Sequence, residues 1–223
     1  MPEAYHNYQR DLAYIIRWNQ RKGNVPTLLM HACCGPCSTY CIEYLSQFFK
    51  ITIFYYNPNI APAEEYAHRV EEIKRFVSTF KTKYPVEFIE GEYGPKKFYE
   101  AVHGLEDEPE GGKRCRKCFE LRLGEAARIA KERGFDFFTT TLSISPKKDE
   151  QVLNIVAKEQ GAIYGIKPLP ADFKRKGGFN RSVELSEQYN LYRQEYCGCV
   201  YSLREYEERL KKQASKTENA REG

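Results

Sequence analysis

An apolar run near the N-terminus ends in cysteines and a turn, and it reads Leu28-Leu29-Met30-His31-Ala32-Cys33-Cys34-Gly35-Pro36-Cys37-Ser38. Adjacent side chains on a regular strand point to opposite faces, so Cys33 and Cys34 serve one site only if the chain bends there. Gly35 and Pro36 supply such a bend, and a helical pattern follows directly. The run therefore predicts a buried strand, a tight corner bearing thiols, and a helix.

The rest of the chain alternates between strand-like and helix-like patterns. Strands are predicted over residues 25–32, 51–56, 86–89, 135–142 and 162–166, and helices over 3–22, 38–49, 63–83, 95–103, 114–133, 146–160, 182–192 and 200–214. This alternation predicts an α/β fold with a Rossmann-like, mostly parallel sheet and additional helices. No linker or internal repeat interrupts the pattern, so we expect one domain over 1–223, with a frayed polar tail over 215–223.

In a sheet of this kind the functional site lies beyond the carboxyl ends of the strands. Three stretches fall there: the corner at Cys33, the loop that follows strand 51–56, and the turn at 140–145. The corner is not a G-x-G-x-x-G motif, so nothing indicates a nicotinamide cofactor. In the second loop, Asn57 and Asn59 are candidates to line a pocket for a polar ring, and loop capping accounts for them equally well.

Composition and cysteine usage narrow the class of protein. With 41% hydrophobic and 30% charged residues, the chain reads as soluble and globular. It has no apolar run of about 18 residues, and its first four residues lack the pattern of a signal peptide, so we expect a cytoplasmic protein with no membrane contact. Its eight cysteines form three tight groups, a pattern that favours metal binding or redox chemistry over a disulfide framework.

Cys115 and Cys118 form a C-x-x-C at the start of a predicted helix. This spacing puts both sulfurs on one helix face, and we expect the helix N-terminus and the neighbouring lysines and arginines to favour thiolates. Together with Cys33 and Cys34 they offer four thiolates, which suit tetrahedral zinc or an iron–sulfur cluster. A four-cysteine site at the functional edge of a sheet favours the cluster.

Cys197-Gly198-Cys199 has only one residue between its cysteines, which is poor spacing for two ligands on a regular helix. The glycine permits the geometry of a strained, reducible disulfide, so Cys197 and Cys199 are candidates for a two-electron carrier. Two inert buried thiols or two metal ligands are the alternatives.

Two rival functions share these cysteines. Cys34-Gly35-Pro36-Cys37 matches the tetrapeptide of thioredoxin-type sites, which indicates a thiol–disulfide oxidoreductase. The grouped cysteines also suit a zinc-stabilised nucleic-acid-binding protein. A thiol–disulfide oxidoreductase needs neither Cys33 nor the later cysteine groups, which weakens that interpretation. Cys41 and His31 are expected to be ordinary core residues.

A basic segment lies near the end of the predicted sheet. Asp172 is its single acid, and its basic residues are Lys167, Lys174, Arg175, Lys176 and Arg181. With Phe173 and Phe179 interleaved, the segment either grips phosphates and stacks a base or forms a solvated loop. Asp172 is a candidate metal ligand or proton donor, with a plain salt bridge as the alternative.

These motifs, taken in order, resemble those of the QueH family of epoxyqueuosine reductases over residues 25–202. The resemblance rests on His31-Ala32-Cys33-Cys34-Gly35-Pro36-Cys37, Tyr56-Asn57-Pro58-Asn59-Ile60, Glu65-Tyr66 with Arg69, Arg114-Cys115-Arg116-Lys117-Cys118-Phe119, Thr140-Thr141-Leu142-Ser143-Ile144-Ser145-Pro146-Lys147-Lys148 and Tyr196-Cys197-Gly198-Cys199-Val200-Tyr201-Ser202. It implies the final step of queuosine modification of tRNA, in which an epoxide is reduced to an alkene, and a fold akin to the adenine nucleotide α-hydrolases.

The resemblance also implies a cofactor and partners. It implies a 4Fe-4S cluster on Cys33, Cys34, Cys115 and Cys118, and a redox-active pair at Cys197 and Cys199. A second mononuclear iron or other metal is a further option, held by Cys197, Cys199 or Asp172, and an external electron donor is required. For the anticodon loop we expect contacts from Arg175, Lys176 and Arg181, with Lys147 or Lys148 stabilising an alkoxide or binding phosphate.

Overall fold

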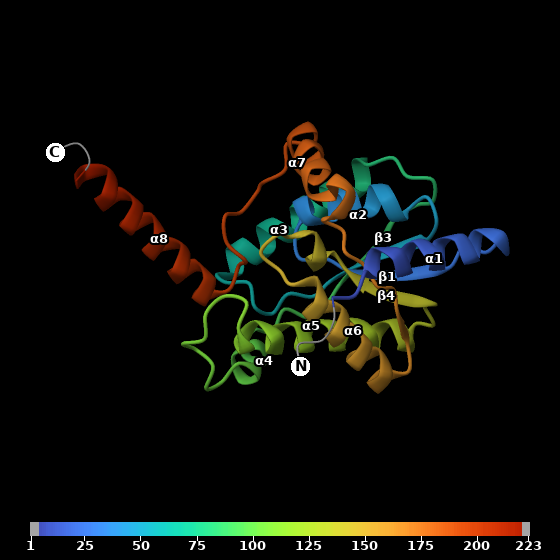
Figure 1. Ribbon diagram of the computed structural model, residues 1–223, viewed down its shortest axis with the longest axis horizontal. Coiled ribbons are helices and arrows are strands. Elements are labelled where there is room, and N and C mark those ends of the chain that lie inside the picture. Colours follow the sequence, from blue (N-terminus) through green and yellow to red (C-terminus); the bar gives the residue numbers. More distant parts are fainter. Residues whose placement is uncertain (1–4, 220–223) are drawn as a thin grey trace.

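The computed structural model describes residues 5–219 and contains a sheet of five parallel strands (Figure 1). The strands are β1 (Thr27–His31), β2 (Lys50–Tyr55), β3 (Glu87–Glu90), β4 (Phe137–Thr140) and β5 (Lys167–Pro168). Their order across the sheet is β3-β2-β1-β4-β5, and every neighbouring pair is parallel. The predicted Rossmann-like α/β fold is therefore confirmed, with β1 at its centre.

Helices cover both faces of the sheet. They are α1 (Tyr8–Arg21), α2 (Gly35–Leu45), α3 (Ala63–Thr79), α4 (Pro95–Ala101), α5 (Lys113–Glu132), α6 (Glu150–Tyr164), α7 (Gly178–Gln188) and α8 (Val200–Asn219), with 3-10 turns η1 (Thr141–Ile144) and η2 (Arg175–Gly177). In Figure 1, α8 extends away from the sheet and its covering helices. None of the helices within residues 5–219 combines the length and the apolar character needed to cross a bilayer.

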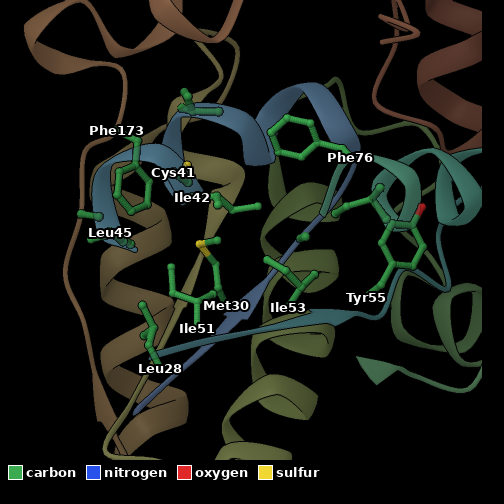
Figure 2. Packing of buried hydrophobic residues seen from close by; sticks show 14 of the residues in the cluster. Leu28, Met30, Cys41, Ile42, Leu45, Ile51, Ile53, Tyr55, Phe76 and Phe173 are labelled. Atoms are coloured by element: carbon green, nitrogen blue, oxygen red, sulfur yellow. The ribbon is translucent and has the colours of Figure 1, made fainter. Parts of the chain in front are cut away.

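The alternation of β1 divides the core into two layers. Leu28 and Met30 pack with residues of α1, α2 and α3, while Leu29 packs on the opposite face with residues of α5 and α6. Figure 2 shows the first layer, where Met30 and Ile53 of the sheet lie below Ile42 of α2. Burial on both faces is what the uninterrupted apolar run predicts for a central parallel strand.

The largest differences from the predicted elements surround α6. The predicted helix 146–160 begins later, at Glu150, because the Asp149 side chain accepts hydrogen bonds from the two following free N–H groups, those of Gln151 and Val152. Pro146 therefore lies before the helix and not in its first turn. The predicted strand 162–166 is wrong: α6 runs through Tyr164 and ends at Gly165, whose φ of +69° gives a left-handed C-cap.

The remaining differences are shifts of element ends. The predicted helix 38–49 already begins at Gly35 with Pro36 in its first turn, the predicted helix 182–192 spans Gly178–Gln188, and the predicted strand 135–142 gives way to η1 after Thr140. Residues 215–219 of the predicted tail continue α8. Residues 220–223, and residues 1–4 with the beginning of the predicted helix 3–22, lie outside the described part of the chain.

Candidate active site

The corner after β1 brings three thiols together. Cys34 precedes the first turn of α2 in an extended conformation, and its carbonyl accepts a hydrogen bond from Ser38 Oγ at 2.7 Å. The sulfurs of Cys33 and Cys34 lie 3.7 Å apart, and both lie within 4.8 Å of the sulfur of Cys37. The adjacent cysteines do lie in one site, as predicted, but the chain bends at Cys33, and Gly35 is already the first residue of α2.

Hydrogen bonding makes the three corner thiols unequal in acidity. Hydrogen bonds from Cys34 and Cys37 lower the pKa of Cys33 well below its usual value. The same contact raises the pKa of Cys34 to about 12 and that of Cys37 well above its usual value. Because Cys34 is also 1% exposed, it is a poor nucleophile for an incoming disulfide, which disfavours the thioredoxin-type interpretation.

A second thiol group lines a small cavity beside the first. Cys115 and Cys118 lie in the first turns of α5, and Cys197 and Cys199 lie just before α8. All eight cysteines of the chain are unpaired. Burial raises the pKa of Cys115, and raises that of Cys118 to about 12, against the expectation that the helix N-terminus and the neighbouring lysines and arginines favour thiolates there. Without a bound cation, burial raises the pKa of these two thiols more than the helix dipole lowers it.

Arg122 connects the two thiol groups. Its guanidinium is 1% exposed and donates to Asn57 Oδ1, lies 3.4 Å from His31 Nε2 and reaches Cys118 Sγ at 3.9 Å. Burial disfavours the charged form of Arg122. Its pKa is nevertheless raised, and what raises it is not a carboxylate but the sulfurs of Cys118, Cys197 and Cys33. A buried cation needs a negative partner. The geometry therefore calls for an anionic sulfur centre beside Arg122.

His31 is the buried core histidine that was expected. Its Nδ1 lies 2.9 Å from Thr140 Oγ1 and its Nε2 lies 3.1 Å from the Tyr56 carbonyl oxygen. Burial and the nearby Arg122 lower its pKa to about 3, so it is neutral. Cys41 is likewise fully buried, and its thiol donates to the Cys37 carbonyl at 3.3 Å.

A larger pocket of about 260 Å³ opens above the corner thiols. Lys148, Glu110 and Cys197 line both this pocket and the small cavity. Lys148 Nζ lies 2.9 Å from Glu110 Oε1, with 7% of its side chain exposed; burial opposes its charge, but Cys197 and Glu110 raise its pKa. A buried ammonium paired with Glu110 thus lies where the small cavity and the larger pocket adjoin.

The two predicted asparagines have different environments. Asn57 Nδ2 donates to the Ala32 carbonyl at 2.8 Å and its Oδ1 accepts from Arg122, so its amide holds the loop and the cation in place. Asn59 is 2% exposed and lines the small cavity, where its Oδ1 is buried without a hydrogen-bond partner. Asn59 is therefore available to a group in that cavity.

The basic segment is occupied by ion pairs. Arg175 lies 2.9 Å from Asp172 and also contacts the Tyr5 hydroxyl, while Arg181 lies 2.7 Å from Glu43. Lys176 is exposed in η2, with φ +54°. Asp172 is 2% exposed, and none of these basic residues nor Asp172 is among the described residues that line either cavity. Their contacts with RNA, and the catalytic role of Asp172, stay predictions.

Lys147 is the predicted cation that does reach the pocket. It lines the larger pocket, and its Nζ donates to the Glu195 carbonyl at 3.3 Å. Sequence reasoning missed Arg122 and Glu110 altogether. Arg122 had a readable signal, since it lies four residues after Cys118 on the same helix face. Glu110 had none, because nothing in the sequence distinguishes it from the other acids of its loop.

Fold and site together define a cysteine-rich α/β protein with a Rossmann-like sheet, in which seven of the cysteines line two adjoining cavities. Residues 28–205 match the family model described as epoxyqueuosine reductase QueH. The chain is 46% identical over 205 residues to a protein of that name from Streptococcus pyogenes serotype M1, covering 91% of this chain and 80% of the relative. It is 45% identical over 200 residues to one from Staphylococcus epidermidis, covering 88% and 84%, and 36% identical over 189 residues to one from Thermotoga maritima, covering 82% and 93%. The chain belongs to the QueH family of epoxyqueuosine reductases.

Proposed function

We propose that this chain reduces the epoxide of epoxyqueuosine, at the wobble position of tRNA, to the alkene of queuosine. The reaction consumes two electrons and two protons and releases water. It takes place with the tRNA in the cytoplasm. What supports the proposal is the convergence of thiols from three chain segments around the buried cation Arg122, in a member of this family.

The donor set fits an iron–sulfur cluster. Four thiolates around a cluster form an anion, and Arg122 is a buried cation whose charge is matched by sulfur atoms. We assign Cys33, Cys34, Cys115 and Cys118 as its ligands, two from each thiol group. When bound, a 4Fe-4S cluster supplies electrons at a low potential. Cys37, whose sulfur completes the corner trio, is the competing ligand.

Cys197 and Cys199 are assigned as the two-electron store. Oxidation of the two thiols to a disulfide releases two electrons and two protons, which balance the conversion of the epoxide to alkene and water. An external donor then reduces the disulfide. Lys148 and Lys147, both on the pocket wall, stabilise negative charge that develops on the epoxide oxygen. A second metal is the alternative use of Cys197 and Cys199, which both line the small cavity.

The decisive experiment is mass spectrometry of nucleosides from tRNA that carries epoxyqueuosine, after incubation with anaerobically purified protein and a strong reductant. Conversion to queuosine is expected, from a brown protein with about four irons per chain. Unchanged epoxyqueuosine would refute the reaction. A colourless, metal-free and fully active protein would refute the cluster, and one stoichiometric zinc would favour the nucleic-acid-binding alternative.

The Cys197→Ser variant tests the electron store. It is expected to keep its iron and lose turnover, because one thiol cannot deliver two electrons as a disulfide. Cys41→Ser is the matched control, since that sulfur is buried in the core and is not among the residues lining either cavity. Full activity of Cys197→Ser would remove the redox role of the pair.

A further inference from the structure

One wall of the larger pocket is a connecting segment that ends in the Cys197/Cys199 pair and whose other residues have no part in the proposed reaction. It spans residues 189–199, between α7 and α8, and is called the strap. Figure 1 shows this connection running from α7 towards the start of α8. It contributes Arg193, Gln194, Glu195, Tyr196 and Cys197 to the pocket.

Helix α3 holds the strap at both ends. Arg75 donates to the carbonyls of Tyr189 and Asn190 at 3.2 and 3.0 Å, and the Glu72 carboxylate accepts the N–H of Tyr192. Near the other end, Arg69 donates to the Cys197 carbonyl at 3.3 Å. The three anchoring residues recur every third position and so share one helix face. The strap is therefore a fixed wall whose side chains are positioned in advance.

Gln194 stands on this wall with an unused hydrogen-bond acceptor. Its Oε1 is buried and has no partner, although the residue lines an open pocket. An orphaned buried acceptor is costly, which is why most are paired. By turning its terminal amide towards the pocket, Gln194 can present this acceptor to a donor on whatever fills the pocket.

Phe179 supplies a flat apolar face in the same pocket. The ring is partly exposed, and the Arg193 guanidinium lies 5.7 Å from its centroid on the strap side. Aromatic and guanidinium planes are the surfaces on which unstacked bases pack in RNA recognition. The pocket holds about 260 Å³, just below the roughly 300–1,000 Å³ of sites for drug-sized ligands, which suits one heterocycle and excludes a whole dinucleotide.

We propose that this pocket reads the base itself: Gln194 Oε1 accepts from the N–H edge of a guanine-type heterocycle that packs against Phe179. This inference rests on the proposed function and extends it, because the corner thiols and Cys197 line the same pocket. A side arm of the bound base then reaches the redox groups. Adenine is rejected because its N1 is an acceptor and would face the Gln194 oxygen.

Binding of RNA hairpins tests the inference without any epoxide chemistry. Two anticodon hairpins differing only in guanosine or adenosine at the wobble position are titrated against the anaerobically purified protein. The wild type should bind the guanosine hairpin about tenfold more tightly than the adenosine hairpin. Guanosine gains one hydrogen bond to Gln194, whereas adenosine leaves that buried acceptor unpaired. Gln194→Met should bring this ratio close to one. Gln194→Glu, which keeps an acceptor at that position, should retain the preference.

Two further variants separate recognition from structure. Gln188→Met changes an exposed glutamine of α7 and should leave the ratio unchanged. Phe179→Ala should weaken both hairpins by about five- to 100-fold, since stacking is tolerant of base identity. A wild type without guanosine preference, or a Gln194→Met variant that keeps it, would overturn the inference. Because neither hairpin carries an epoxide, these results are independent of whether epoxyqueuosine is reduced.

Discussion

Replacing Gly198 by alanine should destabilise the junction between the strap and the small cavity. Gly198 has φ +113°, and an added Cβ would lie 2.9 Å from Arg69 Nη1 and 3.0 Å from Ile60 Cγ1. The unusual φ costs an L-residue about 1–3 kcal/mol. Arg69 cannot yield easily, because it is fully buried and bound to Glu65 and to the Cys197 carbonyl. Overpacking therefore adds about 1–3 kcal/mol.

Gly104→Ala is the matched control for this variant. Gly104 also has a positive φ, +77°, but nothing lies within 4 Å of an added Cβ, so it carries the backbone strain without the clash. The excess loss at Gly198 should be about 1–3 kcal/mol, and each kcal/mol lowers the melting temperature of a chain this size by about 2–4 °C. Differential scanning calorimetry of the two variants, purified and measured under identical anaerobic conditions, gives the comparison.

Hydrogen exchange locates the effect. The Ala61 amide donates to the Gly198 carbonyl at 2.9 Å, so its protection should fall in Gly198→Ala and stay unchanged in Gly104→Ala. Equal melting temperatures for the two variants, together with unchanged protection of Ala61, would refute the reasoning. In that case the close approach of position 198 to Arg69 would not affect the free energy of unfolding.

Three more variants test the site. Cys118→Ala should lose iron and visible absorbance while Cys41→Ala keeps both; equal iron in the two would exclude Cys118 as a ligand. Arg122→Met should weaken metal retention about 10–100-fold in a chelator titration, and unchanged retention would contradict its role as counter-charge. Asp172→Asn should lower the free energy of unfolding by about 1–3 kcal/mol, because the ion pair that it breaks joins a buried carboxylate, Asp172, to the partly exposed Arg175. Turnover per folded molecule should stay unchanged. Lost turnover at normal stability would instead support a role of Asp172 as proton donor.

Much of the fold was readable from local pattern. The apolar run that ends at Cys33 predicted a strand buried on both faces, and β1 is that strand. Elements were misplaced where two local signals competed. Pro146 suits a first turn, but the Asp149 side chain caps the helix later, and the apolar residues before Gly165 extend a helix in place of forming a strand. Periodicity over so few residues does not separate these outcomes.

The site was predictable only as far as its sulfur atoms. Grouped cysteines pointed to the thiols, yet the sequence does not say that Arg122 lies between two groups, because that depends on how α5 packs on β1. The RNA contacts of the basic segment stay a prediction. Arg175 pairs with Asp172, three residues before it in sequence, whereas the partner of Arg181, Glu43, is brought close only by the tertiary fold. Gln194 carried no signal, since a single polar residue in a connection is ordinary.

The spread of the thiols along the chain has a consequence for assembly. The corner lies at the end of β1 and the last thiol precedes α8, so Cys33 and Cys199 belong to opposite ends of the folded chain. Contacts of such long sequence separation form late in folding. A partly folded chain therefore offers a metal only the corner or the C-x-x-C. With the proposed ligand set, tight loading of the centre would report that the corner after β1 and the first turns of α5 have met.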